Sequence, residues 1–417
     1  MNTYPVVPRP VKNSAVRPPG SKSITNRALI SSALAAGRSE LIDPLISDDT
    51  RAMMGCLREL GVRISVTDRS ITVESAGLLR GGTDLDAGAS GTTARFITAA
   101  ATLADSPSRI DGTPRMRERP IGPLVAALRA LGAGIEADRN GAYPPVRVEG
   151  GGLVGGRVTI DGSLSSQFVS AVLLSSPQAE TDVVLDLAEG TVSRPYLDTT
   201  LEVMTAFGAD ARWIDSGTIV VAPTGYRPTR FKVEADASAA VYPWVAAAIT
   251  GATITVTGIP SDSSQADLEA LTTLRRMGCT ITSTSKGISV TGPDQPMGVE
   301  ADLNDCPDAS LALAVVAAFA SSGSRFTNLA NLRVKETDRL AALEAELTRL
   351  GAVVETGPDW ISIRPGRPRP ALIRTYDDHR MAMSFAIAGL VQPGIVIEDP
   401  ACVTKTWPGF FDMLESL

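Results

Sequence analysis

The chain is predicted to be an α/β (α+β) protein with two similar domains, each made of three βαβαββ modules in an inside-out barrel-like arrangement. Two observations on its 417 residues predict this fold. One is an amphipathic helix that ends in glycine and runs into a strand, repeated at a nearly constant interval. The other is an interleaved series of helices rich in small residues. One module of roughly 70 residues is too small to bury its own helices, so three should share a core, and we expect a cleft between the two domains.

The first helix series ends at five regularly spaced glycines. Apolar residues three and four apart precede each one, and the glycine supplies a left-handed cap before a strand. The glycines are Gly61, Gly132, Gly208, Gly278 and Gly351, which by subtraction are 71, 76, 70 and 73 residues apart. The chain end cuts off a sixth copy, GFFDMLESL. A helix, a glycine and a strand are common in α/β proteins, but that alone does not explain the constant interval.

The second helix series is rich in alanine, glycine and serine, and each helix leads into a β-branched segment. Its members begin at GSKSITNRAL, GASGTTARF, GSLSSQFVS, DASAAVYPW, PDASLALAV and DDHRMAMSF. Small side chains suit close packing inside a domain, whereas the more charged first series should face outward.

Composition excludes several functional classes. The chain is 44% apolar and 20% charged, as in soluble globular proteins, and no apolar run is long enough to cross a membrane. The N-terminus lacks the apolar stretch of a signal peptide, so we expect a cytoplasmic protein. A net charge of −7 argues against a nucleic-acid partner. Four scattered cysteines and a single histidine, His379, argue against a zinc or iron site, and we expect neither metal nor cofactor.

Polar residues gather at the expected helix starts. A helix N-terminus leaves backbone N–H groups unpaired and carries about half a positive charge, so several of them together predict a small, multiply anionic ligand. Cations at such positions oppose the helix dipole, which suggests that a bound anion compensates. Lys22, Arg119, Lys335 and Lys405 are placed in this way. Alternatively, Asp48, Thr50 and Asp236 are ordinary N-caps, and Arg119 belongs to a solvated charged turn.

Two carboxylates are candidates for acid–base chemistry. Asp308, in CPDAS, and Glu336, in RVKETDR, each lie at an expected helix start beside cations. A carboxylate in that setting can stay ionised or cycle a proton. The alternatives, an N-cap for Asp308 and a first-turn residue for Glu336, remain equally open.

Six segments closely resemble the 5-enolpyruvylshikimate-3-phosphate (EPSP) synthases: PGSKSITNRAL, GTPRMRERPIGPL, DGSLSSQFVSA, VSRPY, RVKETDRL and YDDHRMAM. The resemblance covers almost the whole chain. It implies two domains linked by two crossovers, one comprising 21–235 and the other 1–20 plus 236–417. It also implies transfer of the enolpyruvyl group of phosphoenolpyruvate to the 5-hydroxyl of shikimate 3-phosphate, through a tetrahedral intermediate. That step belongs to aromatic amino-acid biosynthesis and is the target of glyphosate, and a monomer is expected.

The same resemblance implies roles for individual residues. The residues expected to hold shikimate 3-phosphate are Lys22, Ser23, Arg27, Ser165, Ser166, Gln167, Ser193, Tyr196, Asp308 and Lys335. Those expected to hold phosphoenolpyruvate are Lys22, Gly91, Arg119, Gln167, Arg339, Arg380 and Lys405. Lys22, Asp308 and Glu336 are expected to be catalytic, Asp308 at the attacking hydroxyl and Glu336 at the methylene carbon. Asp49, Thr92, Asn331 and His379 are expected near the site without an assigned role.

Two positions depart from the family pattern. The loop that commonly reads GNAGT reads GASGT here, so Ala89 stands where an asparagine amide could bind phosphoenolpyruvate. Ala401 replaces the lysine that usually follows the C-terminal Asp-Pro, and we expect Lys405 to supply that charge. The open alternatives are the related transferase that uses UDP-N-acetylglucosamine, a secondary-metabolism paralogue with another acceptor, and a non-catalytic anion-binding repeat protein.

Overall fold

The computed structural model describes residues 2–417, which form two compact units. One unit is Gly20–Val233, and the other consists of residues 2–19 together with Glu234–Leu417. The boundaries expected from the sequence, after residues 20 and 235, lie within two residues of these. Each unit has its own hydrophobic core. The chain is therefore organised as two bodies that are each stabilised from within.

Five of the six modules have the same four-stranded sheet topology. The first two strands are parallel, the last strand pairs antiparallel with the second, and the third strand lies at the edge; the sixth module lacks this edge strand. In one module, for example, Leu185 pairs with Val158 on one side and Ile219 on the other. Five sheets have four strands and the sixth has three, and they remain separate. The predicted βαβαββ module is confirmed.

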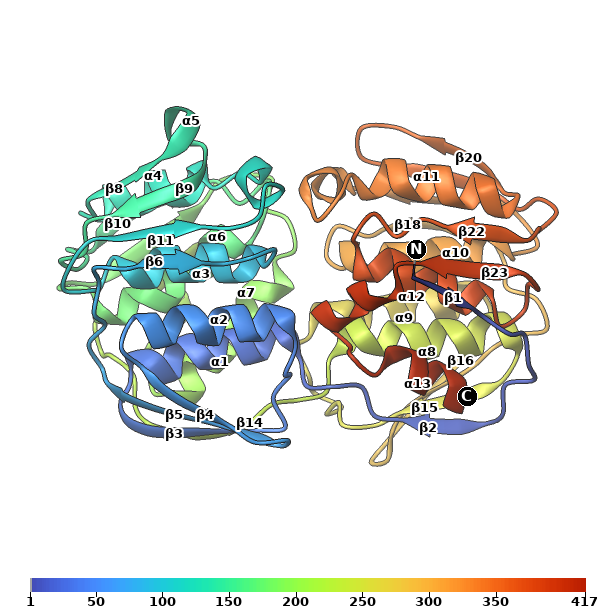
Figure 1. The fold of residues 1–417 in the computed structure, drawn as a ribbon, viewed down its shortest axis with the longest axis horizontal. Helices are drawn as coiled ribbons and strands as arrows, with labels where there is room; N and C mark the ends of the chain where they lie inside the picture. The colour runs from blue at the N-terminus through green and yellow to red at the C-terminus, as the bar shows by residue number, and fades with distance from the viewer. Residues whose placement is uncertain (1) are drawn as a thin grey trace. The chain divides into compact units, whose positions relative to one another are not determined.

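The unit Gly20–Val233 contains three modules, with helices stacked side by side and sheets on the outside (Figure 1). The first module has β14 (Arg230–Lys232), α1 (Lys22–Leu34), β3 (Ala36–Ile42), α2 (Asp48–Glu59), β4 (Arg63–Val66) and β5 (Ser70–Ala76). The second has β6 (Asp84–Asp86), α3 (Gly91–Ala101), β7 (Ser108–Asp111), α4 (Gly122–Ala130), β8 (Ile135–Ala137), the short α5 (Asp138–Gly141) and β9 (Tyr143–Val148). The third has β10 (Gly156–Ile160), α6 (Gln167–Ser175), β11 (Val183–Leu187), α7 (Pro195–Ala206), β12 (Ala211–Trp213) and β13 (Thr218–Val221).

The other unit repeats this plan. Its first module has β2 (Ser14–Val16), α8 (Ala237–Thr250), β15 (Thr253–Val256), α9 (Ala270–Arg276), β16 (Thr280–Thr284) and β17 (Gly287–Thr291). The second has β18 (Glu300–Asp302), α10 (Ser310–Ala318), β19 (Ser324–Thr327), α11 (Arg339–Leu350), β20 (Val353–Thr356) and β21 (Ile361–Arg364). The third has β22 (Ala371–Ile373), α12 (His379–Ala388), β23 (Ile395–Glu398), α13 (Phe410–Ser416) and β1 (Thr3–Pro5).

Strands from distant parts of the chain complete three modules. β14 supplies the first strand of the module that contains α1, and β2 does the same for the module that contains α8. The copy that the chain end cuts off is completed by β1, which pairs antiparallel with β23 (Figure 1). A strand borrowed in this way covers an edge that would otherwise be open.

The two helix series have the predicted environments. Every residue of α3, α10 and α12 is buried, as their small side chains suggested. α2 and α11 each bury one face and expose the other. All five predicted capping glycines have positive φ angles, between 84° and 113°. Since L side chains rarely adopt this conformation, these positions require glycine.

Short 3₁₀ turns precede helices in both units and carry polar residues. They span Met116–Glu118, Pro307–Ala309, Ala330–Val334 and Pro400–Lys405. Two further 3₁₀ turns are Ser176–Gln178 and Ala266–Glu269. Among residues 2–417, no helix is long and apolar enough to cross a membrane.

Candidate functional site

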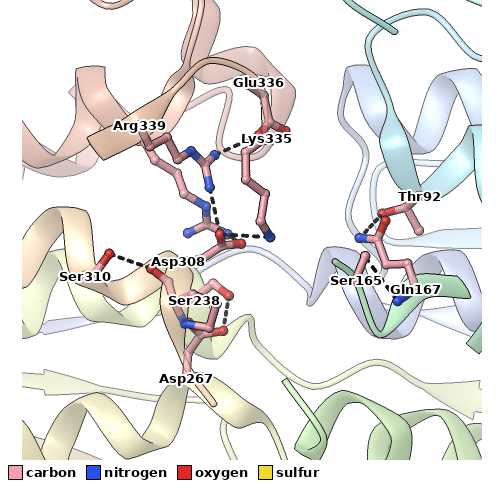
Figure 2. A network of polar contacts seen from close by, with 12 residues as sticks. Thr92, Ser165, Gln167, Ser238, Asp267, Asp308, Ser310, Lys335, Glu336 and Arg339 are labelled. Atoms are coloured by element: carbon pink, nitrogen blue, oxygen red, sulfur yellow. Dashed lines mark hydrogen bonds and ion pairs between the residues drawn. The ribbon is translucent and has the colours of Figure 1, made fainter. Parts of the chain in front are cut away.

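A network of buried charges centres on Arg339, the first residue of α11 (Figure 2). Its guanidinium is only 1% exposed and contacts three carboxylates. The distances are 2.6 Å from Nε to Asp378 Oδ2, 2.7 Å from Nη1 to Asp308 Oδ1, and 2.9 Å from Nη2 to Glu336 Oε2. Although burial alone would lower the pKa of Arg339, these three carboxylates raise it above its ordinary value. Arg339 is therefore a permanent cation that fixes three acidic groups in one place.

Asp308 also binds two further cations of the network. Its Oδ2 lies 3.1 Å from Nη2 of Arg380, and its Oδ1 lies 3.4 Å from Nζ of Lys335. Burial raises the pKa of Asp308, but Arg380, Lys335 and Arg339 outweigh it and hold the pKa well below its usual value. Asp308 is thus a carboxylate at neutral pH, with both oxygens bound to cations.

Glu336 joins the same network through its second oxygen. Its Oε1 lies 3.1 Å from Nζ of Lys405, a residue that is only 8% exposed. Ala401, which replaces a lysine of the family pattern, is exposed. Glu336 is therefore bound by two cations, Arg339 at one oxygen and Lys405 at the other. We refer to Asp308, Lys335, Glu336, Arg339, Asp378, Arg380 and Lys405 as the carboxylate network.

Asp378 anchors the network from the start of α12. It is fully buried, caps the helix by accepting the N–H of Arg380 at 2.8 Å, and binds Arg339 through both oxygens. The two preceding residues, Tyr376 and Asp377, have φ angles of 55° and 54°, which are costly for residues other than glycine. Tyr376 donates its hydroxyl to buried Glu346 of α11 at 2.8 Å, which ties the strained segment to that helix.

In the unit Gly20–Val233, the most buried candidate is Arg27 of α1, which has only neutral partners. Its guanidinium donates to the Thr200 hydroxyl at 2.7 Å, the Ser23 carbonyl at 2.9 Å, and both Ser170 Oγ and the Tyr196 carbonyl at 3.2 Å. Because burial is not offset by a carboxylate, the pKa of Arg27 falls to about 10. We call these five residues the Arg27 cluster.

Lys22 and Asp49 join two helix starts in this unit. Lys22 is the first residue of α1, and its Nζ lies 3.0 Å from Oδ2 of Asp49 in the first turn of α2. The Thr93 hydroxyl of α3 donates to the Asp49 carbonyl at 3.2 Å. These contacts hold the N-terminal ends of α1, α2 and α3 together.

Gly91 and Arg119 are in close contact at the start of α3. A Cβ atom on Gly91 would lie 2.6 Å from Nη2 of Arg119, so only glycine leaves room for the guanidinium at the start of α3. Thr92 directly follows Gly91 in the first turn of α3, and its hydroxyl accepts a hydrogen bond from Gln167 Nε2 at 3.2 Å. This contact joins the starts of α3 and α6.

The serines expected to hold a phosphate lie at two helix starts. Ser165 accepts the N–H of Gln167 at 3.3 Å (Figure 2). Buried Ser166 is the N-cap residue of α6. Ser193 lies two residues before α7 with a φ angle of 53°, and Tyr196 lies in the first turn of that helix. Hydroxyls and exposed backbone N–H groups at a helix start suit a phosphate.

The prediction that Arg119, Lys335 and Lys405 lie at helix starts is wrong. Each follows or ends a 3₁₀ turn, and the next helix begins three to five residues later, at Gly122, Arg339 and Phe410. The cations that do lie in a first helical turn, Lys22, Arg339 and Arg380, are paired with the protein's own carboxylates. A bound anion is therefore not needed to explain them.

The N-cap alternatives have mixed outcomes. Asp236 caps α8 by accepting the N–H of Ala239 at 3.0 Å. Asp48 is not a cap, because the cap residue of α2 is Ser47, whose N–H donates to the Thr50 hydroxyl at 2.9 Å. Asp308 is not a cap either, since it lies in the turn before α10 and its carboxylate binds cations instead.

Two near-site residues lie beside the carboxylate network. His379 is buried, and its Nδ1 is 3.6 Å from Asp378 Oδ1. Asn331 is 5% exposed in the 3₁₀ turn before Lys335, and its Oδ1 has no hydrogen-bond partner among residues 2–417. Across residues 2–417, no group of three or more His, Cys, Asp or Glu side chains is arranged to hold a metal ion.

Three residues without a role in the sequence analysis contact predicted site residues in the structure. Asp378 anchors Arg339, Arg95 contacts Gln167 at 2.5 Å, and the Tyr242 hydroxyl lies 3.5 Å from Nη1 of Arg380. Burial raises the pKa of Tyr242 to about 12, so it stays neutral at physiological pH. Two signals were present in the sequence: Arg95 is the one charged residue of α3, and Tyr242 brings a hydroxyl into the alanine-rich helix α8.

Comparisons with known proteins agree on one family. Residues 8–414 match the family described as EPSP synthase (3-phosphoshikimate 1-carboxyvinyltransferase). A 3-phosphoshikimate 1-carboxyvinyltransferase from Nostoc punctiforme is 42% identical over 422 residues, covering 99% of this chain and 98% of the relative. The chloroplastic enzyme of Brassica napus is 39% identical, covering 99% and 85%. The structure of EPSP synthase from Acinetobacter baumannii is similar with a TM-score of 0.82 at 26% identity, covering 100% of this chain and 98% of that one.

Proposed function

Since the chain belongs to the EPSP synthase family, we propose that it transfers the enolpyruvyl group of phosphoenolpyruvate to the 5-hydroxyl of shikimate 3-phosphate. Phosphate is released, and the product continues toward chorismate and the aromatic amino acids. The enzyme is a 3-phosphoshikimate 1-carboxyvinyltransferase. The reaction as written needs no cofactor.

The observation that carries this proposal is the sharing of Arg339 by Asp308 and Glu336, at 2.7 and 2.9 Å. An anion-binding protein would have no reason to bury carboxylates among the cations that its ligand needs. Addition and elimination at a carbon–carbon double bond, in contrast, requires one proton acceptor at the attacking hydroxyl and another group at the methylene carbon. Two carboxylates held apart by one guanidinium suit this division of roles.

The proposed reaction has two steps. In the first, the 5-hydroxyl oxygen attacks C2 of phosphoenolpyruvate while Asp308 takes the hydroxyl proton, and C3 gains a proton to become a methyl group. In the second, C3 loses a proton, the double bond re-forms, and the C2–O bond to phosphate breaks. Glu336 must be protonated when the first step begins: it gives its proton to C3 in that step and takes one back from C3 in the second. The proton taken up by Asp308 leaves with the phosphate, so both carboxyl groups return to their starting states. Lys22 stabilises the negative charge of the departing phosphate.

Ligand binding should itself make Asp308 a better base. In the free protein, Arg380, Lys335 and Arg339 keep its pKa below the usual value, which makes it a weak proton acceptor. The carboxylate and phosphate of phosphoenolpyruvate would share these cations and add negative charge nearby. Both effects raise the pKa of a carboxyl group, so Asp308 gains basicity when the substrate is present.

We assign the ligand contacts by unit. In the unit Gly20–Val233, Arg27 would hold the carboxylate of shikimate 3-phosphate, while Ser165, Ser166 and Ser193 would hold its phosphate. The further contacts to this substrate are Lys22, Ser23, Gln167, Tyr196, Asp308 and Lys335. Phosphoenolpyruvate would contact Lys22, Gly91, Arg119, Gln167, Arg339, Arg380 and Lys405. The buried charge of Arg27, which has only neutral partners, supports a carboxylate ligand there.

We further propose a cytoplasmic monomer that binds neither nucleic acid nor membranes. The net charge of −7 supports the absence of a nucleic-acid partner. Light scattering coupled to gel filtration tests the monomer, which at 43.6 kDa is well separated from a dimer. Glyphosate should compete with phosphoenolpyruvate.

The function is tested by following phosphate release from phosphoenolpyruvate with each candidate acceptor. We expect release with shikimate 3-phosphate and formation of an enolpyruvyl ether at its 5-position, detected by mass spectrometry and ³¹P NMR. UDP-N-acetylglucosamine should give no release. Release with UDP-N-acetylglucosamine alone, or with neither acceptor, would contradict the proposal.

A further inference from the structure

Arg95 lies inside unit Gly20–Val233, on the fully buried helix α3, where its side chain is 5% exposed. Nη1 lies 2.5 Å from Oε1 of Gln167, and Nη2 lies 3.4 Å from the carbonyl oxygen of Pro120. The guanidinium carbon is 5.0 Å from the ring centre of Phe168. Arg95 thus links α3, the start of α6 and the residue that directly follows Arg119.

This contact determines which way the Gln167 amide faces. A guanidinium has five N–H donors and no acceptor, so the amide must present its carbonyl oxygen to Arg95. Its NH₂ group then faces away, where it donates to the Thr92 hydroxyl at 3.2 Å. Because a hydroxyl can accept as well as donate, Thr92 does not oppose this orientation.

The same contact makes Gln167 a stronger donor. Within residues 2–417, the contact to Thr92 uses one of the two hydrogens on the amide nitrogen. The other hydrogen is available to a ligand. A positive charge on the carbonyl side polarises the amide and strengthens the hydrogen bonds that its N–H groups donate.

We propose that Arg95 is a positioning residue: it holds Gln167 as a hydrogen-bond donor to an acceptor oxygen of the substrates and, through the Pro120 carbonyl, holds the segment that carries Arg119. The inference rests on the proposed function and assigns to that site a residue that does not itself touch the ligand. The ligand group selected at Gln167 is an oxygen without a hydrogen of its own, such as a carboxylate or phosphoryl oxygen. Arg95 would thus position two parts of the anion site, the Gln167 amide and the segment that carries Arg119.

A purely structural role must be distinguished from this one. Arg95 packs over Phe168 and joins two buried helices, so its loss could simply loosen the unit. A packing role predicts that Arg95 and Gln167 contribute independently to catalysis. The positioning role predicts that Arg95 matters mainly while Gln167 is present, because Gln167 is the group through which it acts.

The test is a double-mutant cycle of wild type, Arg95→Met, Gln167→Met and the double variant. For each protein, kcat and KM are measured for both substrates, and urea unfolding reports the fold. Each single variant should lower kcat/KM for phosphoenolpyruvate by roughly 10- to 100-fold, the cost of losing a hydrogen bond to a charged group. The double variant should be within about threefold of the weaker single variant, because coupled residues are not additive. Multiplied effects, or wild-type kcat/KM in Arg95→Met, would overturn the inference.

Arg95→Lys keeps the result interpretable if Arg95→Met does not fold. Lysine retains the charge but offers one point of contact in place of the fork, so it can reach Gln167 or Pro120 but not hold both. We expect kcat/KM between those of wild type and Gln167→Met, with unfolding close to that of wild type. A value below that of Gln167→Met would contradict the inference.

Failure of the proposed function can be separated from failure of the inference. If wild type binds phosphoenolpyruvate by calorimetry but shows no transfer to shikimate 3-phosphate, the function is wrong, and the cycle is then judged on the dissociation constant for phosphoenolpyruvate. If wild type is active and the cycle is additive, only the inference is wrong. If wild type binds neither anion, both are wrong.

Discussion

Arg27 and Arg339 are both buried arginines, one in each unit, yet their environments are opposite. Arg27 is held by hydroxyls and backbone carbonyls, and burial lowers its pKa to about 10. Arg339 is held by Asp308, Glu336 and Asp378, which raise its pKa. One unit thus contains a buried positive charge with neutral partners, and the other contains cations already neutralised by carboxylates.

The different partners of Arg27 and Arg339 suit different tasks, ligand binding for Arg27 and proton transfer for the carboxylates around Arg339. A cation with neutral partners gains electrostatic stabilisation when an anionic ligand arrives, which favours tight and selective binding. Cations paired with carboxylates gain less from a ligand, but the ligand changes the proton affinity of the carboxylates. We therefore associate the Arg27 cluster with holding the acceptor substrate and the carboxylate network with moving protons.

Replacing each arginine by methionine should give the largest contrast between the units. Arg339→Met leaves three buried carboxylates without their shared cation, so we expect a loss of about 3–5 kcal/mol in the free energy of unfolding. Arg27→Met leaves only neutral groups without a partner, and we expect about 1–3 kcal/mol. Urea unfolding at pH 7 measures both. Equal losses would show that the charge environments do not differ as described.

The same pair should differ in the response to ligand. Saturating shikimate 3-phosphate should raise the unfolding midpoint of wild type clearly and that of Arg27→Met much less, because the carboxylate of the ligand has lost its cation. Thermal unfolding with and without ligand gives this comparison. If the ligand raised the unfolding midpoint of Arg27→Met as much as that of wild type, Arg27 would not contribute to binding shikimate 3-phosphate.

Acid should affect the carboxylate network selectively, with a smaller effect than the arginine substitutions. The pKa of Asp308 is lower in the folded protein than in the unfolded chain, so its ionisation contributes stability above the unfolded value of about 3.9, which is lost as the pH falls through the folded value. Asp308→Asn lacks this contribution. The difference in unfolding free energy between wild type and Asp308→Asn should therefore shrink below about pH 4. A difference that stays constant from pH 7 to pH 3 would contradict this assignment.

The smallest expected effect concerns Ala89, one residue before the N-cap Ser90 of α3. Ala89→Asn adds an amide donor beside Gly91, and one added hydrogen bond is worth about 0.5–1.5 kcal/mol. The KM for phosphoenolpyruvate should fall about two- to tenfold, whereas the KM for shikimate 3-phosphate serves as the control and should not change. An unchanged KM for phosphoenolpyruvate would mean that residue 89 does not reach the ligand.

Much of the fold could be predicted because its signals are local. Glycine caps and small-residue helices recur in each module, and both depend on short-range geometry. The pairing of β1 with β23 could not be predicted, because strands of three and four residues more than 390 positions apart carry no mutual signal. The chain end therefore looked like a truncated module although the N-terminus completes it.

The sequence indicated which residues to consider for the candidate site, but not which cations and carboxylates pair with one another. Lys335 and Lys405 were assigned to helix starts because 3₁₀ turns resemble the first turn of a helix in sequence. In the sequence, Asp378 looks like an ordinary N-cap. Its bidentate contact with Arg339, 39 residues earlier in the chain, joins the starts of α11 and α12. Such pairings arise only from tertiary packing.

The central claim is that the unit Gly20–Val233 mainly binds and the carboxylate network mainly transfers protons. It is tested by comparing Asp308→Asn with Ser166→Ala in the same assays: calorimetry for shikimate 3-phosphate and rapid-quench measurement of phosphate release. Asparagine keeps an oxygen that accepts a hydrogen bond from the substrate hydroxyl but cannot take its proton. We therefore predict that Asp308→Asn binds shikimate 3-phosphate within about threefold of wild type but releases phosphate about 10²- to 10⁴-fold more slowly, the usual cost of losing a general base. Ser166→Ala should weaken binding and leave release at saturation within about tenfold, as expected for a lost binding contact. Release by Asp308→Asn at the wild-type rate would contradict the account.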